Sequence, residues 1–537
     1  MRNGASREPV ADGPGTPRLE RAIRLPQATA MVVGTIIGTS IFVQPSEVTG
    51  QVPSVAGIFA VWIVCGVLTL FGALVCAELS SIFTRSGGVY VYLSEAYSPA
   101  LGFLWGWAMF WTMHSGIIAA IATVCGRYTA YFVPMGDNGI KAVAIGVILI
   151  LSAVNYAGVR HGSQLQTLFT AGKLLAIALI IVGGFALGSE AHRRVMAASG
   201  TASSADAGAG PTEPIAPAGP TDPTVPVPTD PDAPLPTDPP SERLETPPAP
   251  DQAGVVEFLL ALVAGLFAFG GWHMVTYNSE ETVEPRSTIP RALILGVAIV
   301  TVCYVAMNAV YMWVLPLETI AASTRVAADA ADAVLGSGGG AMMSGLVIFS
   351  AFGALAGIVL AGPRVYYAMA QDGLLFRWAG AVHPRFHTPH RAIVLQAIWS
   401  SVLVATGTYR ALFTRVIYTE WIFFGLMALG LLILRRRDAR DAAREPNRAG
   451  SPDGNEAHSA KHVETAGAAT AQNAPAAEAR RPYHADYRIW GYPAVPIVFA
   501  LSAFAIVINQ VIDSPIESLT GLSLVLIGLP VYYWWAR

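Results

Sequence analysis

Long apolar runs separated by short polar stretches fill most of the chain. Most of them reach the roughly 20 residues that a helix needs to cross the hydrocarbon core of a bilayer. We predict spans at 26–50, 54–79, 88–122, 141–159, 164–188, 254–278, 290–315, 341–371, 391–408, 412–434, 493–511 and 517–535. This pattern predicts an all-α polytopic membrane protein with about twelve transmembrane helices.

The distribution of basic residues predicts the orientation of these spans. Residues 1–24 are polar and rich in arginine, and they lack the apolar segment of a secretory signal, so we expect a cytoplasmic N-terminal tail. With this tail inside, the inner segments hold 24 of the 33 Lys and Arg residues, the outer segments hold 8, and Lys173 lies within a span. This excess predicts that both termini are cytoplasmic, in a cell (plasma or inner) membrane.

Two segments differ in composition from the spans around them. Residues 189–253 contain 15 of the 37 prolines, which predicts a disordered extracytoplasmic loop. Residues 438–490 are rich in Ala, Arg, Glu and small polar residues, which predicts a disordered cytoplasmic loop. The chain then divides into a first group of spans (25–188), a second group (254–437) and two C-terminal helices (491–537).

Composition excludes several classes of function. Hydrophobic residues make up 53% of the chain and charged residues 13%, against roughly 25% charged in soluble domains. These values argue against a soluble enzyme, a disordered scaffold and a nucleic-acid-binding protein. Cys65, Cys76, Cys125 and Cys303 lie in apolar runs without partners at metal-ligand spacing, so we expect no metal site. No ATP-binding loop or catalytic triad motif appears, so we expect neither an enzyme nor a cofactor.

Glycines interrupt the first and sixth spans at corresponding places. The first span contains GTIIGTS over 34–40, and the sixth contains GLFAFGGWH over 265–273. Five spans separate the two starts, as expected for a 5+5 inverted repeat. Paired discontinuous helices of this kind mark the midplane site of many transporters. The alternative is that the glycines only allow close packing of helices.

The chemistry of a broken helix indicates what such a site would bind. Unwound backbone within lipid leaves N–H and C=O groups unpaired, at a cost of several kcal/mol each, unless they line a cavity and meet a ligand. The freed N–H groups at a helix N-terminus suit a carboxylate, and the freed carbonyls at a C-terminus suit an ammonium. An α-amino acid carries both groups on one carbon, so the breaks favour an amino acid.

Several motifs resemble a known family. GTIIGTSIFVQP in the first span, GLFAFGGWHMVTYNSEETVEPRSTIPRAL around the sixth and GPRVYYAMAQDGLLF in the eighth are similar to those of the amino acid–polyamine–organocation (APC) superfamily. In particular, they resemble the L-type amino acid transporter light chains and their bacterial relatives. The similarity runs from about Arg24 to Arg537, without the two segments predicted to be disordered. It implies a LeuT-type core with discontinuous helices 1 and 6, and secondary transport of amino acids by alternating access.

The resemblance implies a role for each residue at the two breaks. The amides of Gly38, Thr39 and Ser40 would meet the substrate carboxylate. The carbonyls of Ile36 and Phe267 would meet its ammonium, and the ring of Phe267 is similar to the family's outer gate.

Three further positions are similar to pocket residues of the family. They are Gly270 in the second break, His273, where L-type relatives often carry Asn, and Trp421 in the tenth span. Ser40 replaces a glycine of the family's Gly-Ser-Gly pattern, so its side chain either narrows the approach to the amides or adds a hydroxyl to them. The outer loop near 132–140 has no Cys, so we expect no disulfide-linked heavy chain.

Lys173 lies in the middle of the fifth span, where an unpaired ammonium is expensive. We therefore expect it to face the interior of the bundle. In the resemblance it occupies the place where sodium-coupled relatives hold an ion, and Ser350 in the eighth span is a candidate neighbour. A fixed cation would make sodium unnecessary, whereas a lysine that releases its proton would couple transport to protons.

Other ionisable residues have two readings each. Glu420 either binds a cationic side chain or a proton, or it pairs with Arg415. His114 either lines the pocket or hydrogen-bonds a backbone carbonyl, and we expect Glu78 to pair with a loop arginine. We also expect a cytoplasmic latch between spans six and seven, formed by Glu280, Glu281, Glu284, Arg286 and Arg291.

We therefore expect a sodium-independent transporter of amino acids that works by exchange or proton coupling. Phe267, Trp421 and their apolar neighbours favour neutral L-amino acids. Two alternatives stay open: an amino-acid-binding membrane sensor without net transport, and a polyamine or cationic amine carrier that uses Glu420. The expected partners are the amino acid and membrane lipid, with no nucleic acid.

Overall fold

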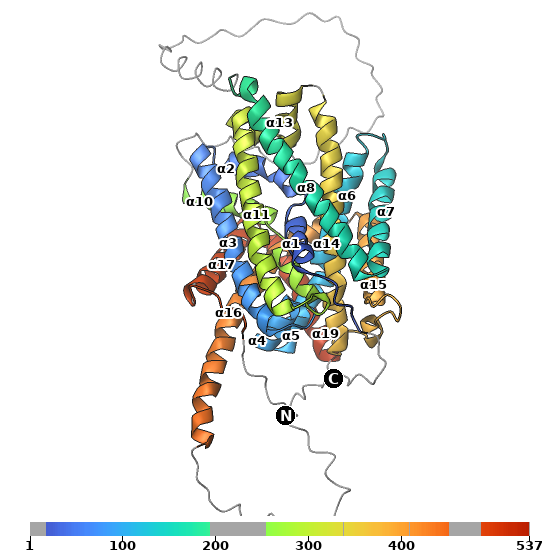
Figure 1. Ribbon diagram of the computed structural model, residues 1–537, viewed down its shortest axis with the longest axis vertical. Helices are drawn as coiled ribbons and strands as arrows, with labels where there is room; N and C mark the ends of the chain where they lie inside the picture. The colour runs from blue at the N-terminus through green and yellow to red at the C-terminus, as the bar shows by residue number, and fades with distance from the viewer. Residues whose placement is uncertain (1–17, 194–253, 337, 408, 450–484, 536–537) are drawn as a thin grey trace, which may run out of the picture.

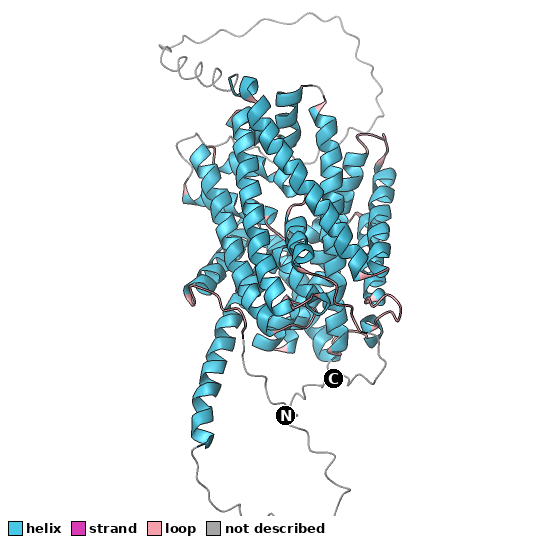
Figure 2. Ribbon diagram, viewed as in Figure 1, coloured by secondary structure: helices cyan, strands magenta, loops and turns pink. Residues whose placement is uncertain are grey.

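The chain folds into a bundle of helices (Figures 1 and 2). The computed structural model describes residues 18–193, 254–336, 338–407, 409–449 and 485–535. Within these ranges no strand is present, and one isolated bridge joins Ile23 to Thr282. The predicted all-α fold is confirmed.

The helices follow one another with short connections. In chain order they are α1 (Leu25–Ile36), η1 (Ser40–Phe42), α2 (Gln44–Gln51), α3 (Val55–Ile82), α4 (Val89–Ala96), α5 (Pro99–Ala108), the π-helical turn η2 (Met109–Met113), α6 (His114–Thr129), α7 (Asp137–Tyr156), α8 (Val159–Leu187), α10 (Val255–Ala268), η3 (Trp272–Glu281), α11 (Pro285–Val314), α12 (Leu317–Ala322), α13 (Val326–Leu335), α14 (Gly339–Gln371), η4 (Arg377–Gly380), α15 (His390–Thr406), α16 (Tyr409–Ala449), α17 (Ala494–Asp513), α18 (Pro515–Leu526) and α19 (Gly528–Trp535).

The helices account for the predicted membrane spans. In the described part of the chain, ten are long and apolar enough to cross a membrane. The first predicted span is divided between α1, η1 and α2, and the ninth is α15, which has 17 residues. The polytopic fold with an interrupted first span thus agrees with the sequence prediction.

Two boundaries differ from the prediction. The third predicted span is divided, because the backbone is extended at Ser98 and Pro99 begins a new helix there, so α4 is separate from α5. Helix α16 continues to Ala449 and runs out of the bundle (Figure 1). Residues 438–449, predicted as the start of a disordered loop, are therefore helical, since Ala and Arg are strong helix formers. The rest of that prediction, and residues 194–253, lie outside the described residues.

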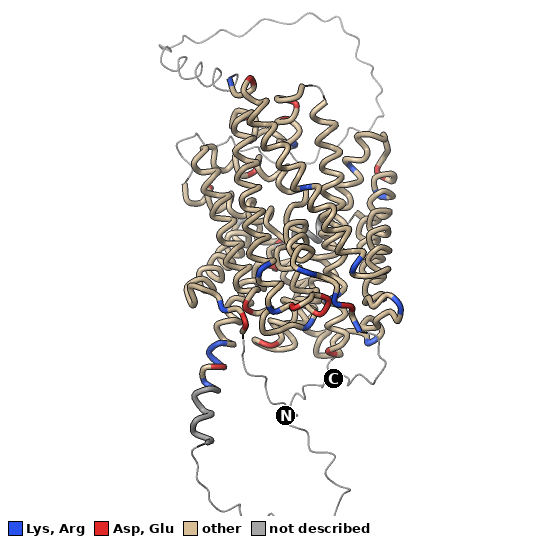
Figure 3. Tube along the Cα trace, viewed as in Figure 1, with Lys and Arg blue, Asp and Glu red and all other residues tan. Residues whose placement is uncertain are grey.

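Charged residues gather at one end of the bundle, close to α4, α5 and α19 (Figure 3). This end, called the inner end below, carries the segments predicted to be cytoplasmic. Arg364 of α14 makes a bidentate ion pair with Glu281 of η3, with both N–O distances 2.8 Å and both side chains fully buried. Asn155 of α7 accepts from Arg364 at 3.2 Å, and Asn278 donates to Glu281 at 2.9 Å. Four elements of two different repeats, if η3 and α14 are paired with α7, therefore meet at one buried charge pair.

Two more ion pairs tie this end together. Glu78 of α3 accepts from Arg435 of α16 at 2.5 and 2.6 Å and from the amide of Ile489 at 2.8 Å, as its predicted arginine pairing requires. Arg85 pairs with Asp372 at the end of α14 at 2.8 Å. The predicted latch between spans six and seven is only partly right, because its main partner is Arg364, which we had assigned to an inner loop.

The N-terminal strand-like segment before α1 also joins this end. The amides of Ala22 and Ile23 both donate to the carbonyl of Glu281 at 2.9 Å, and the amide of Val283 donates to Ile23 at 2.8 Å. Glu281 is thus held by its side chain to α14 and by its backbone to the start of the first span. The inner halves of the first and sixth spans are therefore fastened to each other.

Replacing Arg364 by Ala should lower the free energy of unfolding by about 3–5 kcal/mol, because the buried carboxylate of Glu281 loses its cation. The measurement is unfolding of the purified protein by a denaturing detergent. Arg286→Ala is the matched control, because it removes a half-exposed pair with Asp486 and should cost less than about 1 kcal/mol. Equal losses in the two variants would contradict the importance given to the buried pair.

Candidate functional site

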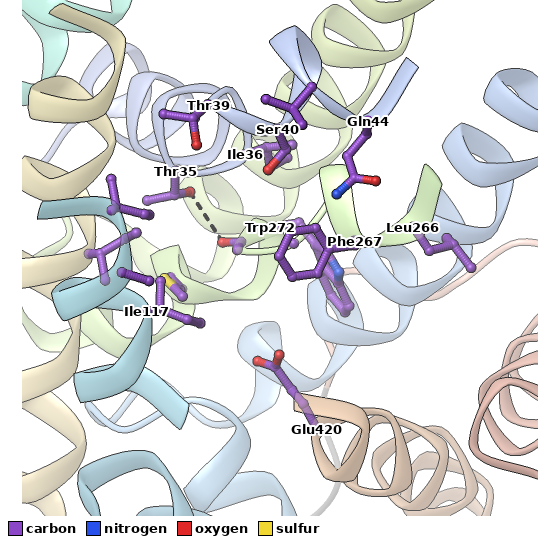
Figure 4. Close-up of a pocket in the computed structure, with 18 of the residues that line it drawn as sticks. Thr35, Ile36, Thr39, Ser40, Gln44, Ile117, Leu266, Phe267, Trp272 and Glu420 are labelled. Atoms are coloured by element: carbon purple, nitrogen blue, oxygen red, sulfur yellow. Dashed lines mark hydrogen bonds between the residues drawn. The ribbon is translucent and has the colours of Figure 1, made fainter. Parts of the chain in front are cut away.

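A cavity of about 300 Å³ lies between the two interrupted spans. Its walls come from both breaks and from α6, α14 and α16 (Figure 4). It is lined by most of the predicted site residues, namely Ile36, Gly38, Thr39, Ser40, Phe267, Gly270, Glu420 and Trp421, and also by Thr35, Gln44, Ile117, Ile121, Gly271, Trp272, Ile358 and Phe424. The two glycine-interrupted segments therefore meet around one enclosed space.

The first break follows from the way α1 ends. The amide of Ile37 still bonds to Val33, at 2.8 Å, but the amide of Gly38 turns back to Ile36, also at 2.8 Å. Helical bonding resumes only when Phe42 donates to Thr39 at 3.1 Å. The amides of Thr39 and Ser40 thus belong to the first turn of a new helix, where no intrahelical acceptor exists.

Lys173 and Ser350 lie behind the break and do not line the cavity. The ammonium of Lys173 donates to the carbonyls of Gly34 at 3.0 Å and Ile37 at 2.7 Å. The hydroxyl of Ser350 donates to the carbonyl of Gly38 at 2.8 Å. Both side chains are buried, at 1% and 0% exposure. They thus satisfy carbonyls that the end of α1 leaves without intrahelical donors.

Tyr304 of α11 links the two breaks, and sequence reasoning did not identify it. Its hydroxyl lies 3.1 Å from the carbonyl of Ile36 and 3.0 Å from that of Ala268, at the ends of α1 and α10. The Ile36 carbonyl also accepts from Gly38, so both of its acceptor positions are in use. An ammonium that binds this carbonyl must therefore share it with, or displace, the tyrosine hydroxyl.

The second break lies against the first. Helix α10 ends at Ala268, the amide of Gly270 donates to Phe267 at 3.1 Å, and Gly271 has a φ of +97°. The hydroxyl of Thr35 donates to the carbonyl of Gly271 at 3.2 Å. A Cβ atom on Gly271 would lie 3.1 Å from the Thr35 carbonyl oxygen, so both its conformation and its space require glycine.

Glu420 is the one acidic residue that lines the cavity. Its carboxylate points into the space, across from Ile36 and Ser40 (Figure 4). Its Oε1 lies 3.5 Å from Nε2 of His273, which is 1% exposed and does not line the cavity. His273 packs against Phe424 and Trp105. The prediction that His273 lines the pocket is therefore wrong: the ring stands behind Glu420 and positions it.

His114 takes the simpler of its two predicted roles. Its Nε2 lies 2.9 Å from the carbonyl of Ile358, and its ring is 1% exposed and outside the cavity lining. The Ile358 carbonyl can only accept, so Nε2 carries the proton. His114 comes directly after the π-helical turn η2, which widens α6 at the level of the cavity.

The cavity has an open outer side and a closed inner side. Phe267, at the outer edge of the second break, exposes 38% of its surface. On the inner side, Glu281 and Arg364 are fully buried. Among the described residues, no group of three or more His, Cys, Asp and Glu side chains is arranged to hold a metal ion.

Comparison with known proteins identifies relatives along most of the chain. The family described as amino acid permease matches residues 23–534. The chain is similar to the b(0,+)-type amino acid transporter 1 of Homo sapiens, at 29% identity over 79% of this chain and 77% of that protein. It is also similar to the large neutral amino acids transporter small subunit 2 of Rattus norvegicus (29%; 80% and 74%) and to the cystine/glutamate transporter of Homo sapiens (28%; 78% and 74%).

Replacing Gly271 by Ala should raise the KM for the transported substrate by about tenfold or more. A non-glycine residue at this φ costs on the order of 1–3 kcal/mol, and the new Cβ would push the two breaks apart. The measurement is the concentration dependence of uptake, with size-exclusion chromatography to confirm folding. Gly146→Ala on α7, where a Cβ meets nothing within 4 Å, is the control and should leave KM unchanged. An unchanged KM in folded Gly271→Ala protein would show that the contact between the breaks is dispensable.

Proposed function

The chain belongs to the amino acid permease family, and from that premise we propose that it is a sodium-independent amino acid exchanger that works by alternating access. The observation that supports this proposal most strongly is the meeting of two broken helices around one cavity. The amides of Thr39 and Ser40 offer donors for a carboxylate. The carbonyls of Ile36 and Phe267 offer acceptors for an ammonium.

The proposed substrate is a neutral L-amino acid. Beyond the polar backbone of the breaks, the cavity is walled by aliphatic and aromatic side chains, among them Ile117, Ile121, Phe267 and Trp421. Phe267 is the proposed outer gate, since it is partly exposed at the open side of the cavity and can cover a bound substrate. The hydroxyl of Ser40, which lines the cavity, adds a donor beside the amides.

Lys173 is the basis for proposing independence from sodium. Its ammonium donates to the carbonyls of Gly34 and Ile37, which are the kind of oxygen ligands a bound cation would require. A cation also stabilises the C-terminal end of a helix. The protein thus carries its own fixed charge at this point, and exchange of one amino acid for another then needs no second ion.

We further propose that the protein lies in the cell membrane with both termini in the cytoplasm and works without a disulfide-linked heavy chain. The excess of Lys and Arg in the inner segments supports the orientation. The connection between α6 and α7 contains no cysteine that could form such a disulfide.

Liposomes that contain the purified protein should accumulate a labelled neutral amino acid faster when unlabelled amino acid is inside. The rate should be the same in sodium and in choline buffer. Lys173→Ala should reduce uptake at least about tenfold, because two buried carbonyls lose their donor at about 1–3 kcal/mol each. Lys141→Ala is the matched control, because Lys141 also donates to a backbone carbonyl but is exposed.

Three outcomes of this experiment would count against the proposal. Binding of amino acids without flux would favour the sensor. A dependence of uptake on external pH that disappears in Lys173→Ala would make Lys173 a proton carrier in a symporter. A requirement for sodium in the wild-type protein would contradict the role given to the lysine.

A second candidate function is transport of cationic amines or cationic amino acids. The observation that favours it is the carboxylate of Glu420, which faces the breaks across an otherwise apolar cavity. A side chain that extends from a zwitterion held at the breaks would point toward this acid. His273, 3.5 Å away, would fix its orientation.

Glu420→Gln distinguishes the two candidates. If the acid binds a cationic side chain, the substitution should abolish competition by arginine and polyamines, and it should leave competition by neutral amino acids within about twofold. A competition panel against one labelled neutral amino acid measures this directly. Glu318→Gln, on the exposed face of α12, is the control. Loss of neutral and cationic competition together would show that Glu420 serves the site as a whole and not a cationic side chain.

A further inference from the structure

A second cavity, of about 310 Å³, lies outside the candidate transport site. It is enclosed by α8, α11, α13 and α14, near the end of the bundle where α13 lies (Figure 1). Its lining includes Gly183 and Leu187 of α8, Leu335 of α13 and Met342 of α14, and no charged residue. None of its lining residues is shared with the first cavity. We call it the outer groove.

The outer groove opens to the outside of the bundle and not to its interior. Leu187, Leu335 and Met342 expose 62%, 53% and 47% of their surface. A Cβ atom on Gly183 would meet nothing within 4 Å, so the missing side chain leaves space for another molecule. In a membrane protein, such an opening faces lipid.

One polar group in the groove has no partner. Tyr311 of α11 lines it, is 1% exposed, and its hydroxyl finds no hydrogen-bond partner among the described residues. A buried hydroxyl without a partner costs about 1–3 kcal/mol. A molecule in the groove that carries an acceptor at this point would remove that cost.

The depth of Tyr311 indicates which acceptor this is. Helix α11 has 30 residues and is about 45 Å long at 1.5 Å per residue, longer than the roughly 30 Å hydrocarbon core. Tyr311 is three residues from its end at Val314, so it lies at the level of the interface. The ester carbonyls of phospholipids lie at this level, directly above their acyl chains. An amino acid does not fit, because the groove offers no partner for its two charges.

We propose that the outer groove binds one acyl chain of a membrane phospholipid and that Tyr311 donates a hydrogen bond to the ester carbonyl of that chain. The apolar walls take the chain, the gap at Gly183 admits it, and the tyrosine fixes its height. Helix α13 covers the groove, so a bound lipid holds α13 against α8 and α14.

Photolabelling of the full chain in liposomes tests this proposal. The probe is a phosphatidylethanolamine with a diazirine in one acyl chain, used in two forms, ester-linked and ether-linked. Mass spectrometry compares labelling of α8 and α13 with labelling of α17, whose exposed Leu501 represents the ordinary lipid-facing surface. The ester form should label α8 and α13 about fivefold more than the ether form does, in keeping with one hydrogen bond of about 1 kcal/mol, and α17 should show no preference.

Two substitutions separate the parts of the proposal. Gly183→Phe should fill the groove and reduce labelling of α8 and α13 at least fivefold, whereas Gly146→Phe on α7, where the Cβ is equally unobstructed, should not. Tyr311→Phe should remove the preference for the ester form without abolishing labelling. Equal labelling by both forms in the wild-type protein, or no effect of Gly183→Phe, would overturn the proposal. Co-purification of a neutral isoprenoid in place of phospholipid would also overturn it.

Discussion

The ammonium of Lys173 is the contact on which the rest of the site depends. A helix that stops within the membrane leaves its last carbonyls without donors and its negative dipole end in a medium of low dielectric constant. Lys173 supplies a cation and two hydrogen bonds at this point, and Tyr304 and Ser350 supply hydroxyls beside it. The break is therefore stabilised by donors from α8, α11 and α14. The amides that follow it can face the cavity because the carbonyls that precede it are already satisfied.

The inner end imposes the complementary constraint. The backbone of Glu281 holds the start of the first span, and its side chain holds Arg364 of α14, so both inner half-spans are fastened to the scaffold. Opening toward the cytoplasm must break contacts, and the exposed ones break at lowest cost. Arg85 and Asp372 are 37% and 28% exposed, so water can replace their pairing, whereas Arg364 and Glu281 are fully buried. The buried pair is expected to move as a unit while the outer ring of contacts separates.

The sequence allowed the helical fold and the two breaks to be predicted, because apolar length and paired glycines act locally. Lys173 was also predictable, since an ionisable residue among apolar neighbours must find a partner inside the protein. Tyr304 was not, because a tyrosine in an apolar helix gives no indication of its partners, and its contact with Ile36 spans 268 positions. Arg364 was placed in a loop although it lies within α14, because a charge near the end of an apolar run reads as a boundary. His273 has the right neighbourhood but stands behind Glu420, a difference of side-chain direction that no periodicity records.

The outer groove and the first break are connected through the same three helices. Lys173, Tyr304 and Ser350 hold the break, and Ala176, Tyr311 and Leu346 of the same helices line the groove. On each helix the two residues are three to seven positions apart, which is at most about two helical turns. Packed helices transmit displacements because their interiors have little free volume. A lipid that spreads α8 from α11 or α14 would therefore change the distances at which the three donors meet the carbonyls of the break, and the membrane would act on the substrate site through the helices that hold it open.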